Sequence, residues 1–132
     1  MAISDVKDRL LDLAREAQQN AYAPYSKFRV GAALLLENGE ILTGCNVENA
    51  SYGLTNCAER SAIFAAVSKL GAANVKIRAL AVVNDHDVPC SPCGACRQVI
   101  AEFGPTATVW YQGRNGIQES TMEELLPDCF RF

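Results

Sequence analysis

Three of the six cysteines in this 132-residue chain are spaced as metal ligands. Cys57 opens the tripeptide Cys-Ala-Glu, and Cys93 and Cys96 form a Cys-x-x-Cys pair that begins 36 residues later (93 − 57 = 36). A catalytic zinc keeps three protein ligands and one open position, whereas a structural zinc is enclosed by four protein ligands. We therefore expect Cys57, Cys93 and Cys96 to hold one Zn²⁺ with an open fourth position.

Two other interpretations of the cysteines stay open at this point. Cys90 precedes Cys93 by three residues, so a closed four-cysteine structural site could include it. The Cys-x-x-Cys pair by itself is also typical of thioredoxin-like redox proteins, although that chemistry leaves the first cysteine without a role. Cys45 and Cys129 show no ligand spacing and are expected to be small buried thiols. The only histidine, His86, also lies outside any ligand spacing.

An acidic residue follows the first predicted ligand closely. Glu59 lies two residues after Cys57, which is about 200° around a helix, so its side chain is directed away from metal ligation. It could still reach a molecule bound at the open position. A carboxylate in that position can take a proton from water and return it to a substrate. Without the zinc ligands beside it, the same glutamate would be an ordinary carboxylate at a helix start.

The chemistry described above requires two helices that begin near the cysteines. The sequence predicts a helix from about residue 57 to Leu70, followed by Gly71, and a second helix between Pro92 and Gly104. The free amides and the dipole at a helix start favour a thiolate over a thiol. Two such helix starts that converge on one cation would explain the spacing of the cysteines.

The remaining segments alternate between strands and helices. A β-hairpin over residues 28–42 is predicted to turn on the two-residue signal Asn38-Gly39. Other predicted elements are an opening helix that ends before Pro24, strands over 77–83, 107–111 and 117–120, and a helical turn over 122–126. This order predicts an α/β fold, a three-layer α-β-α sandwich with a mixed five-stranded sheet.

Composition indicates a globular protein with a small substrate. Hydrophobic residues make up 49% and charged residues 20% of the chain, which is ordinary for a single domain, here residues 1–132. The net charge is −3 and no two basic residues are adjacent, so we expect no nucleic acid polymer as partner. No stretch reaches the about 18 apolar residues of a membrane span, and the N-terminus does not resemble a signal peptide. We expect a cytoplasmic protein that does not bind membranes.

A glutamate combined with Pro-Cys-x-x-Cys is the signature of zinc nucleobase deaminases, for which three cysteines are one known ligand set. Beyond that signature, the sequence closely resembles the small homotetrameric cytidine deaminases over residues 22–130. The matching segments are Phe28-Arg29-Val30-Gly31-Ala32, Asn46-Val47-Glu48-Asn49-Ala50, Cys57-Ala58-Glu59-Arg60 and Pro92-Cys93-Gly94-Ala95-Cys96-Arg97-Gln98. The resemblance implies hydrolysis of cytidine and deoxycytidine to uridine and deoxyuridine plus ammonia. Zinc-bound hydroxide would attack the amino-bearing ring carbon, with Glu59 as proton shuttle.

The resemblance also implies how the nucleoside is bound. Phe28 would stack on the pyrimidine ring, since a flat π-face suits a flat base. Asn46 and Glu48 would hydrogen-bond the ribose hydroxyl. Ala50 and Tyr52 would contact the sugar from a neighbouring subunit of a homotetramer with shared active sites.

Three further residues receive roles. The carbonyl of Ala58, or nearby backbone, could hold the amino group of the substrate. Zinc with three thiolates carries a net charge of −1, and the guanidinium of Arg60 on the ligand sulfurs would offset that charge, as the resemblance also suggests. Phe130, in the segment Leu125-Leu126-Pro127-Asp128-Cys129-Phe130, matches a phenylalanine that reaches a neighbouring subunit's base in the family.

Three other functions compete with this interpretation. A blasticidin-type deaminase shares the zinc motifs, but the segments around Phe28 and Asn46 favour cytidine as substrate. A polynucleotide-editing deaminase would need basic stripes, which this acidic chain lacks. A non-catalytic zinc module would use Cys90 as the fourth ligand and leave Glu59 without a task.

Overall fold

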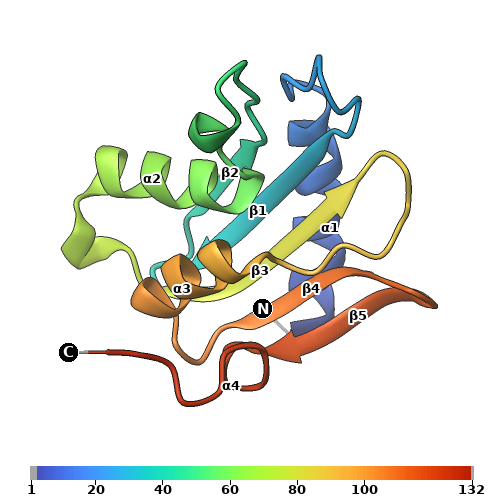
Figure 1. Cartoon of the computed structure of the whole chain (residues 1–132). Coiled ribbons are helices and arrows are strands. Elements are labelled where there is room, and N and C mark those ends of the chain that lie inside the picture. The colour runs from blue at the N-terminus through green and yellow to red at the C-terminus, as the bar shows by residue number, and fades with distance from the viewer. Residues whose placement is uncertain (1–2, 132) are drawn as a thin grey trace.

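Five strands form one mixed sheet in the computed structural model, which describes residues 3–131 and not Met1, Ala2 or Phe132. The strand order is β2-β1-β3-β4-β5 (Figure 1). β1 runs antiparallel to both β2 and β3, β4 runs parallel to β3, and β5 returns antiparallel to β4. The strands are β1 Val30–Leu36, β2 Ile41–Cys45, β3 Ile77–Asn84, β4 Thr108–Gly113 and β5 Gly116–Thr121.

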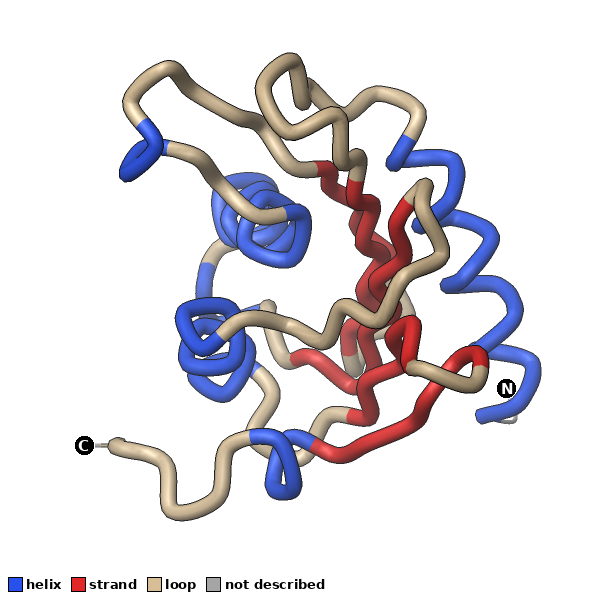
Figure 2. The backbone as a smooth tube through the Cα atoms, turned by 45° about the vertical axis from the view of Figure 1, so that its right-hand side comes forward, coloured by secondary structure: helices blue, strands red, loops and turns tan. Residues whose placement is uncertain are grey.

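Helices cover both faces of the sheet, so the predicted three-layer α-β-α sandwich is confirmed. α1 (Ile3–Gln18) packs on one face, and α2 (Ala58–Leu70) and α3 (Gly94–Phe103) pack on the other (Figure 2). α3 connects the parallel strands β3 and β4, which require a crossover of this kind. A short helix, α4 (Met122–Leu125), follows β5. Within residues 3–131, no helix is both long enough and apolar enough to span a membrane.

β1 is buried along its whole length because helices cover both of its faces. Its alternate residues contribute to two separate cores. Val30 and Leu34 pack with the core under α2 and α3, while Ala33 and Leu35 pack with the core under α1. This double burial explains the uninterrupted apolar run, which is typical of a central strand.

The hairpin between β1 and β2 is confirmed, but its turn is longer than predicted. The Gly39 amide donates to the Leu36 carbonyl (3.0 Å), and the Leu36 amide donates to the Glu40 carbonyl (2.9 Å). Three residues, rather than the two of the Asn38-Gly39 signal, therefore lie inside the turn. Gly39 has a φ of 90°, the left-handed conformation that closes three-residue hairpins.

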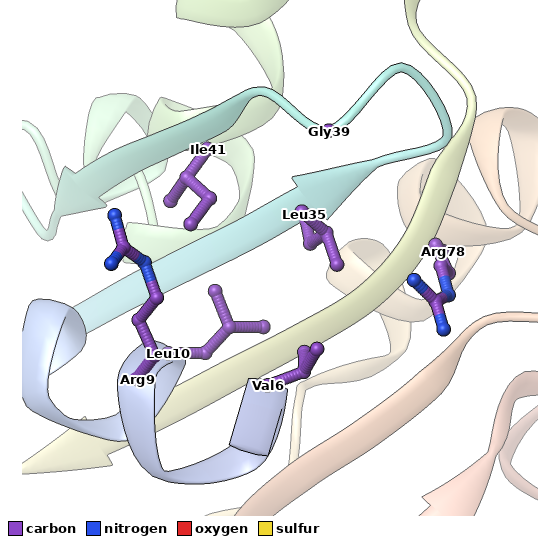
Figure 3. A pocket seen from close by; sticks show the side chains of 7 residues that line it. All are labelled: Val6, Arg9, Leu10, Leu35, Gly39, Ile41 and Arg78. Atoms are coloured by element: carbon purple, nitrogen blue, oxygen red, sulfur yellow. The ribbon is translucent and has the colours of Figure 1, made fainter. Parts of the chain in front are cut away.

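The α1 face contains a cavity of about 370 Å³. Its walls are mostly apolar, with two arginines on opposite sides of it (Figure 3). The lining residues are Val6, Arg9, Leu10, Leu35, Gly39, Ile41 and Arg78. None of the residues predicted to carry chemistry lines this cavity, which lies across the sheet from α2 and α3.

Candidate active site

The three predicted ligand cysteines lie together where α2 and α3 begin. Cys57 is the N-cap residue of α2, Cys93 is the N-cap residue of α3, and Cys96 lies in the first turn of α3. Their sulfurs all lie within 4.8 Å of one another, and the Sγ atoms of Cys57 and Cys93 are 4.0 Å apart. Tetrahedral zinc with Zn–S bonds of about 2.3 Å places its sulfurs about 3.8 Å apart. The three side chains therefore fit one Zn²⁺ ion.

Electrostatics prepare one of these sulfurs to bind a cation. A hydrogen bond from the Cys96 thiol and contact with Arg60 lower the pKa of Cys57 to about 5, although burial opposes the shift. The same hydrogen bond raises the pKa of Cys96, because that thiol holds the shared proton. Arg60 Nη2 lies 3.2 Å from Cys57 Sγ. The Arg60 Nε is buried without a hydrogen-bond partner in the described part of the chain. A thiolate beside a guanidinium is suited to metal binding.

Cys90 stands apart from this cluster. It does not belong to the set of described side chains that could hold a metal together, which counts against the closed four-cysteine site. Its pKa is raised, mainly by burial. Cys45, Cys90 and Cys129, which were predicted to be small buried thiols, are each only half-buried. Because Cys93 is exposed while Cys96 is buried, the cluster faces solvent on one side only.

Glu59 lies in the first turn of α2 and does not belong to the ligand set. It is only 4% exposed. Burial raises the pKa of its carboxyl to about 7, and the negative charge of Cys57 adds to that shift. The neighbouring Arg60 acts in the opposite direction. A carboxyl with a pKa near neutrality can both accept and donate a proton, as acid–base catalysis requires.

Phe28 and Asn46 are joined directly, a link that the sequence did not reveal. The Asn46 Oδ1 accepts the amide of Val30 (2.8 Å), and its Nδ2 donates to the carbonyl of Phe28 (2.8 Å). These two bonds hold the chain at the start of β1, and the Asn46 residue that makes them is only 8% exposed. One amide hydrogen is left for a ligand. Phe28 packs against the core under α2 and α3, with its ring centroid 5.3 Å from that of His86.

Glu48 is bound to the loop that precedes Phe28. Its Oε1 accepts the amides of Tyr25 (2.9 Å) and Ser26 (3.1 Å), and its Oε2 accepts the Ser26 hydroxyl. The Ser26 Oγ also accepts the Phe28 amide (3.0 Å). These bonds lower the pKa of Glu48. Two predicted substrate contacts, Phe28 and Glu48, are therefore linked through Ser26, to which the sequence gave no role.

A cavity of about 360 Å³ adjoins Glu48. Tyr52 lines it with Tyr25, and the two rings meet nearly edge-on, with centroids 6.4 Å apart. Tyr52 is 78% exposed, and the nearby Ala50 is exposed as well. Both residues lie on the loop between β2 and α2 and face outward, where a neighbouring molecule could reach them.

Ala58 and Phe130 lie in contrasting surroundings. Ala58 is fully buried, and its carbonyl oxygen approaches β2 so closely that a Cβ on Gly44 would lie 2.7 Å from it. Phe130 is 68% exposed in the segment that follows α4, which projects from the sheet (Figure 1). The Phe130 carbonyl accepts a hydrogen bond from the Gln98 side chain of α3 (3.2 Å).

Arg97 supports the loop that leads to Cys93, although the sequence assigned it no role. Its Nε donates to the Pro92 carbonyl (2.7 Å), and its Nη2 donates to the Ser91 hydroxyl (3.0 Å). Its Nη1 donates to the Leu125 carbonyl at the end of α4 (2.9 Å). The guanidinium thus connects the metal-binding loop to the C-terminal part of the fold.

Comparison with known proteins agrees with this geometry. The model of the cytidine and deoxycytidylate deaminase zinc-binding region matches residues 4–112. The chain therefore belongs to the family of zinc-dependent cytidine and deoxycytidylate deaminases.

Comparison with individual relatives shows to which members of that family the chain is similar. The chain is 52% identical over 126 residues to the cytidine deaminase of Halalkalibacterium halodurans, covering 94% of this chain and 93% of the relative. It is also similar to the crystal structure of a cytidine deaminase from Burkholderia pseudomallei, with a TM-score of 0.84, 46% identity and coverage of 93% and 98% of the two chains. The blasticidin-S deaminase of Bacillus cereus is more distant, at 32% identity over 130 residues, 95% of this chain and 92% of that protein.

Proposed function

We propose that this protein hydrolyses cytidine and deoxycytidine to uridine and deoxyuridine, with release of ammonia. The observation that carries the proposal is the pairing of three converging cysteine sulfurs with one buried glutamate, Glu59, at the start of the same helix as Cys57. A structural zinc site would have no use for that carboxyl. Family membership and the cytidine deaminases among the relatives support the same substrate.

The residues of the chain divide the reaction between them. A Zn²⁺ held by Cys57, Cys93 and Cys96 would lower the pKa of a water molecule and so supply the nucleophile. Glu59 accepts the proton of that water and gives it to the ring nitrogen beside the amino-bearing carbon, which makes the carbon electrophilic. After the water oxygen has added to that carbon, Glu59 carries the remaining proton of the same water to the amine, which departs as ammonia. Water and cytidine are consumed, and uridine and ammonia are formed.

Other residues hold the nucleoside and tune the metal. Phe28 stacks on the pyrimidine, and Asn46 and Glu48 bind the ribose with the hydrogen-bonding capacity that their bonds to the protein leave free. The backbone of Ala58 binds the amino group. Arg60 offsets the negative charge of three thiolates, a role supported by its 3.2 Å contact with the Cys57 sulfur.

We further propose a homotetramer in which Ala50, Tyr52 and Phe130 contribute to neighbouring active sites. Exposed apolar residues that gather in one region support such self-association. Five large hydrophobic side chains on the two adjacent loops before β1 and after β2 are about half or more exposed: Tyr22, Tyr25, Val47, Tyr52 and Leu54.

The proposal has three further parts: the protein is cytoplasmic, it acts in pyrimidine salvage, and residues 1–132 form one domain. All six cysteines are free in the structure, which suits a reducing compartment. The alternating core residues of β1 connect the layers on both faces of the sheet.

Ultraviolet monitoring of cytidine with purified, metal-analysed protein tests the proposal. We expect turnover that depends on about one zinc per chain and is lost in Glu59→Gln. A parallel assay with blasticidin S as substrate distinguishes a cytidine deaminase from a blasticidin-S deaminase. Protein loaded with zinc that leaves cytidine unchanged would contradict the assignment.

A further inference from the structure

The turn that follows β3 lies against the segment that carries Phe28. The pairing of β1 with β3 extends to Val30 and Asn84. Beyond that pair, Asp85 continues the contact with Arg29, because the Asp85 amide donates to the Arg29 carbonyl (3.1 Å) and the Arg29 amide donates to the Asp85 carboxylate (3.0 Å). The residues before β1 and after β3 are thereby held side by side.

Hydrogen bonds close this turn, so the side chains that it presents have defined positions. Asn84, the last residue of β3, is only 5% exposed. The Asn84 Oδ1 accepts the amides of His86 (3.0 Å) and Val88 (3.2 Å), and its Nδ2 donates to the Val88 carbonyl (2.8 Å). The three bonds fix the backbone from which the His86 side chain extends.

His86 contacts the Phe28 segment in two ways. Its ring lies against that of Phe28, with centroids 5.3 Å apart and planes inclined by 31°. Its Nε2 lies 2.8 Å from the carbonyl oxygen of Lys27, and since a carbonyl only accepts, Nε2 carries the proton. Lys27 has a φ of 59°, a left-handed conformation that a lysine rarely adopts, so contacts must hold the backbone there.

We propose that His86 is a positioning residue for the pyrimidine base: it fixes the ring of Phe28 and the backbone before it, so that Phe28 is ordered before the nucleoside arrives. This inference rests on the proposed function, in which Phe28 stacks on the base. His86 lies outside the cysteine set and takes no part in the proton transfers assigned to Glu59. Its contribution therefore belongs to binding and not to chemistry.

Ordering a side chain in advance removes an entropic cost from binding. Without His86, that cost falls on the nucleoside when it binds. We expect His86→Ala to raise the KM for cytidine about three- to tenfold, the range that follows from ordering one side chain. The kcat should stay within about twofold and the zinc content should be unchanged, because the cysteines and Glu59 are untouched.

Two conservative variants separate the two contacts that His86 makes with the Phe28 segment; the Nε2 atom of His86 also lies 3.4 Å from Asp85 Oδ1. His86→Gln retains a donor for the Lys27 carbonyl, and His86→Phe retains a ring against Phe28. In each of these variants, the KM for cytidine should lie between the wild-type value and the raised value of His86→Ala. Asp87→Asn, in the same turn, is the matched control and should behave as the wild type. Failure of both replacements to recover KM, or an equal rise in Asp87→Asn, would overturn the proposal.

A double-mutant cycle with Phe28→Ala decides whether His86 acts through Phe28. If it does, His86→Ala should add almost nothing to the KM of Phe28→Ala. Fully additive effects, an unchanged KM in His86→Ala, or a loss of kcat or zinc would each contradict positioning. The wild-type assay keeps the two hypotheses distinct: zinc-loaded wild type without cytidine turnover overturns the proposed function and this inference with it, whereas an active wild type with an indifferent His86→Ala overturns the inference alone.

Discussion

On both faces of the sheet, a glycine lets a helix pack closely against a strand, but only one of the two faces carries the metal ligands. Gly31 of β1 faces α1, where an added Cβ would collide with the Ala14 carbonyl oxygen. Gly44 of β2 faces α2, where an added Cβ would lie 2.5 Å from the Ala62 nitrogen. Each missing side chain lets a helix approach the sheet closely. Only on the α2 face does that approach also position metal ligands, because α2 and α3 begin with cysteines.

The comparison teaches that close packing and chemistry are separate properties. The α1 face has a cavity with two arginines, yet no set of described side chains there could hold a metal. The opposite face has a thiolate, a guanidinium and a buried carboxyl within one helical turn. Changes on the α1 face should therefore affect stability alone, and changes on the α2 face should affect both stability and the site.

Removal of a ligand cysteine should have the largest effect. Cys57→Ala, Cys93→Ala or Cys96→Ala should each abolish zinc binding and activity and lower the melting temperature, since metal binding is linked to folding. Metal analysis and thermal denaturation measure both effects. Cys90→Ala is the matched control and should be nearly silent; if it loses zinc as the others do, the four-cysteine structural site gains support.

Glu59→Gln should separate metal binding from catalysis. The variant keeps the shape of the side chain but cannot carry a proton, so we expect turnover to fall by several orders of magnitude while zinc is retained. Steady-state kinetics on metal-analysed protein provide the measurement. Near-normal activity would remove Glu59 from the mechanism.

The two glycines compare the faces directly. Gly31→Ala and Gly44→Ala should each cost about 1–3 kcal/mol of unfolding free energy, as overpacked positions do. Chemical denaturation measures this cost. Zinc affinity should fall only in Gly44→Ala, because that substitution displaces the start of α2. Equal loss of zinc affinity in both variants would show that the faces are not independent.

Phe130→Ala should change substrate binding alone, whereas each of the other variants also changes zinc binding, turnover or stability. Stacking of a base on an aromatic side chain is worth about 1–3 kcal/mol, so the KM for cytidine should rise about tenfold or more without loss of zinc. Gel filtration should find a tetramer. A fully active monomer, or unchanged kinetics in Phe130→Ala, would argue against shared active sites.

Much of the fold and the cysteine cluster could be predicted from the sequence because the signals are local. Helix starts, apolar periodicity and the Cys-x-x-Cys spacing each involve residues close together in the chain. The predicted helix between β3 and β4 is the crossover that allows these two strands to pair in parallel. Cys57 and Cys93 could be expected to meet because each begins a helix on the same sheet.

The network around Phe28 could not be predicted, because its bonds join distant segments. Asn46 bonds the backbone 16 and 18 residues before it, and His86 reaches a carbonyl 59 residues away. No spacing rule covers such contacts. The predicted length of the turn at Gly39 was wrong for a different reason. The Asn-Gly signal is compatible with turns of two and of three residues, and the backbone hydrogen bonds of Leu36 show that three residues lie in this turn.

The three-way contact of Arg97 has a consequence for the order of events during synthesis. Leu125, which accepts one of its hydrogen bonds, follows it by 28 residues. A nascent chain can therefore contain all three ligand cysteines while the loop before Cys93 still lacks one of its supports. The ribosome must extend the chain through α4 before that loop has all of its supports.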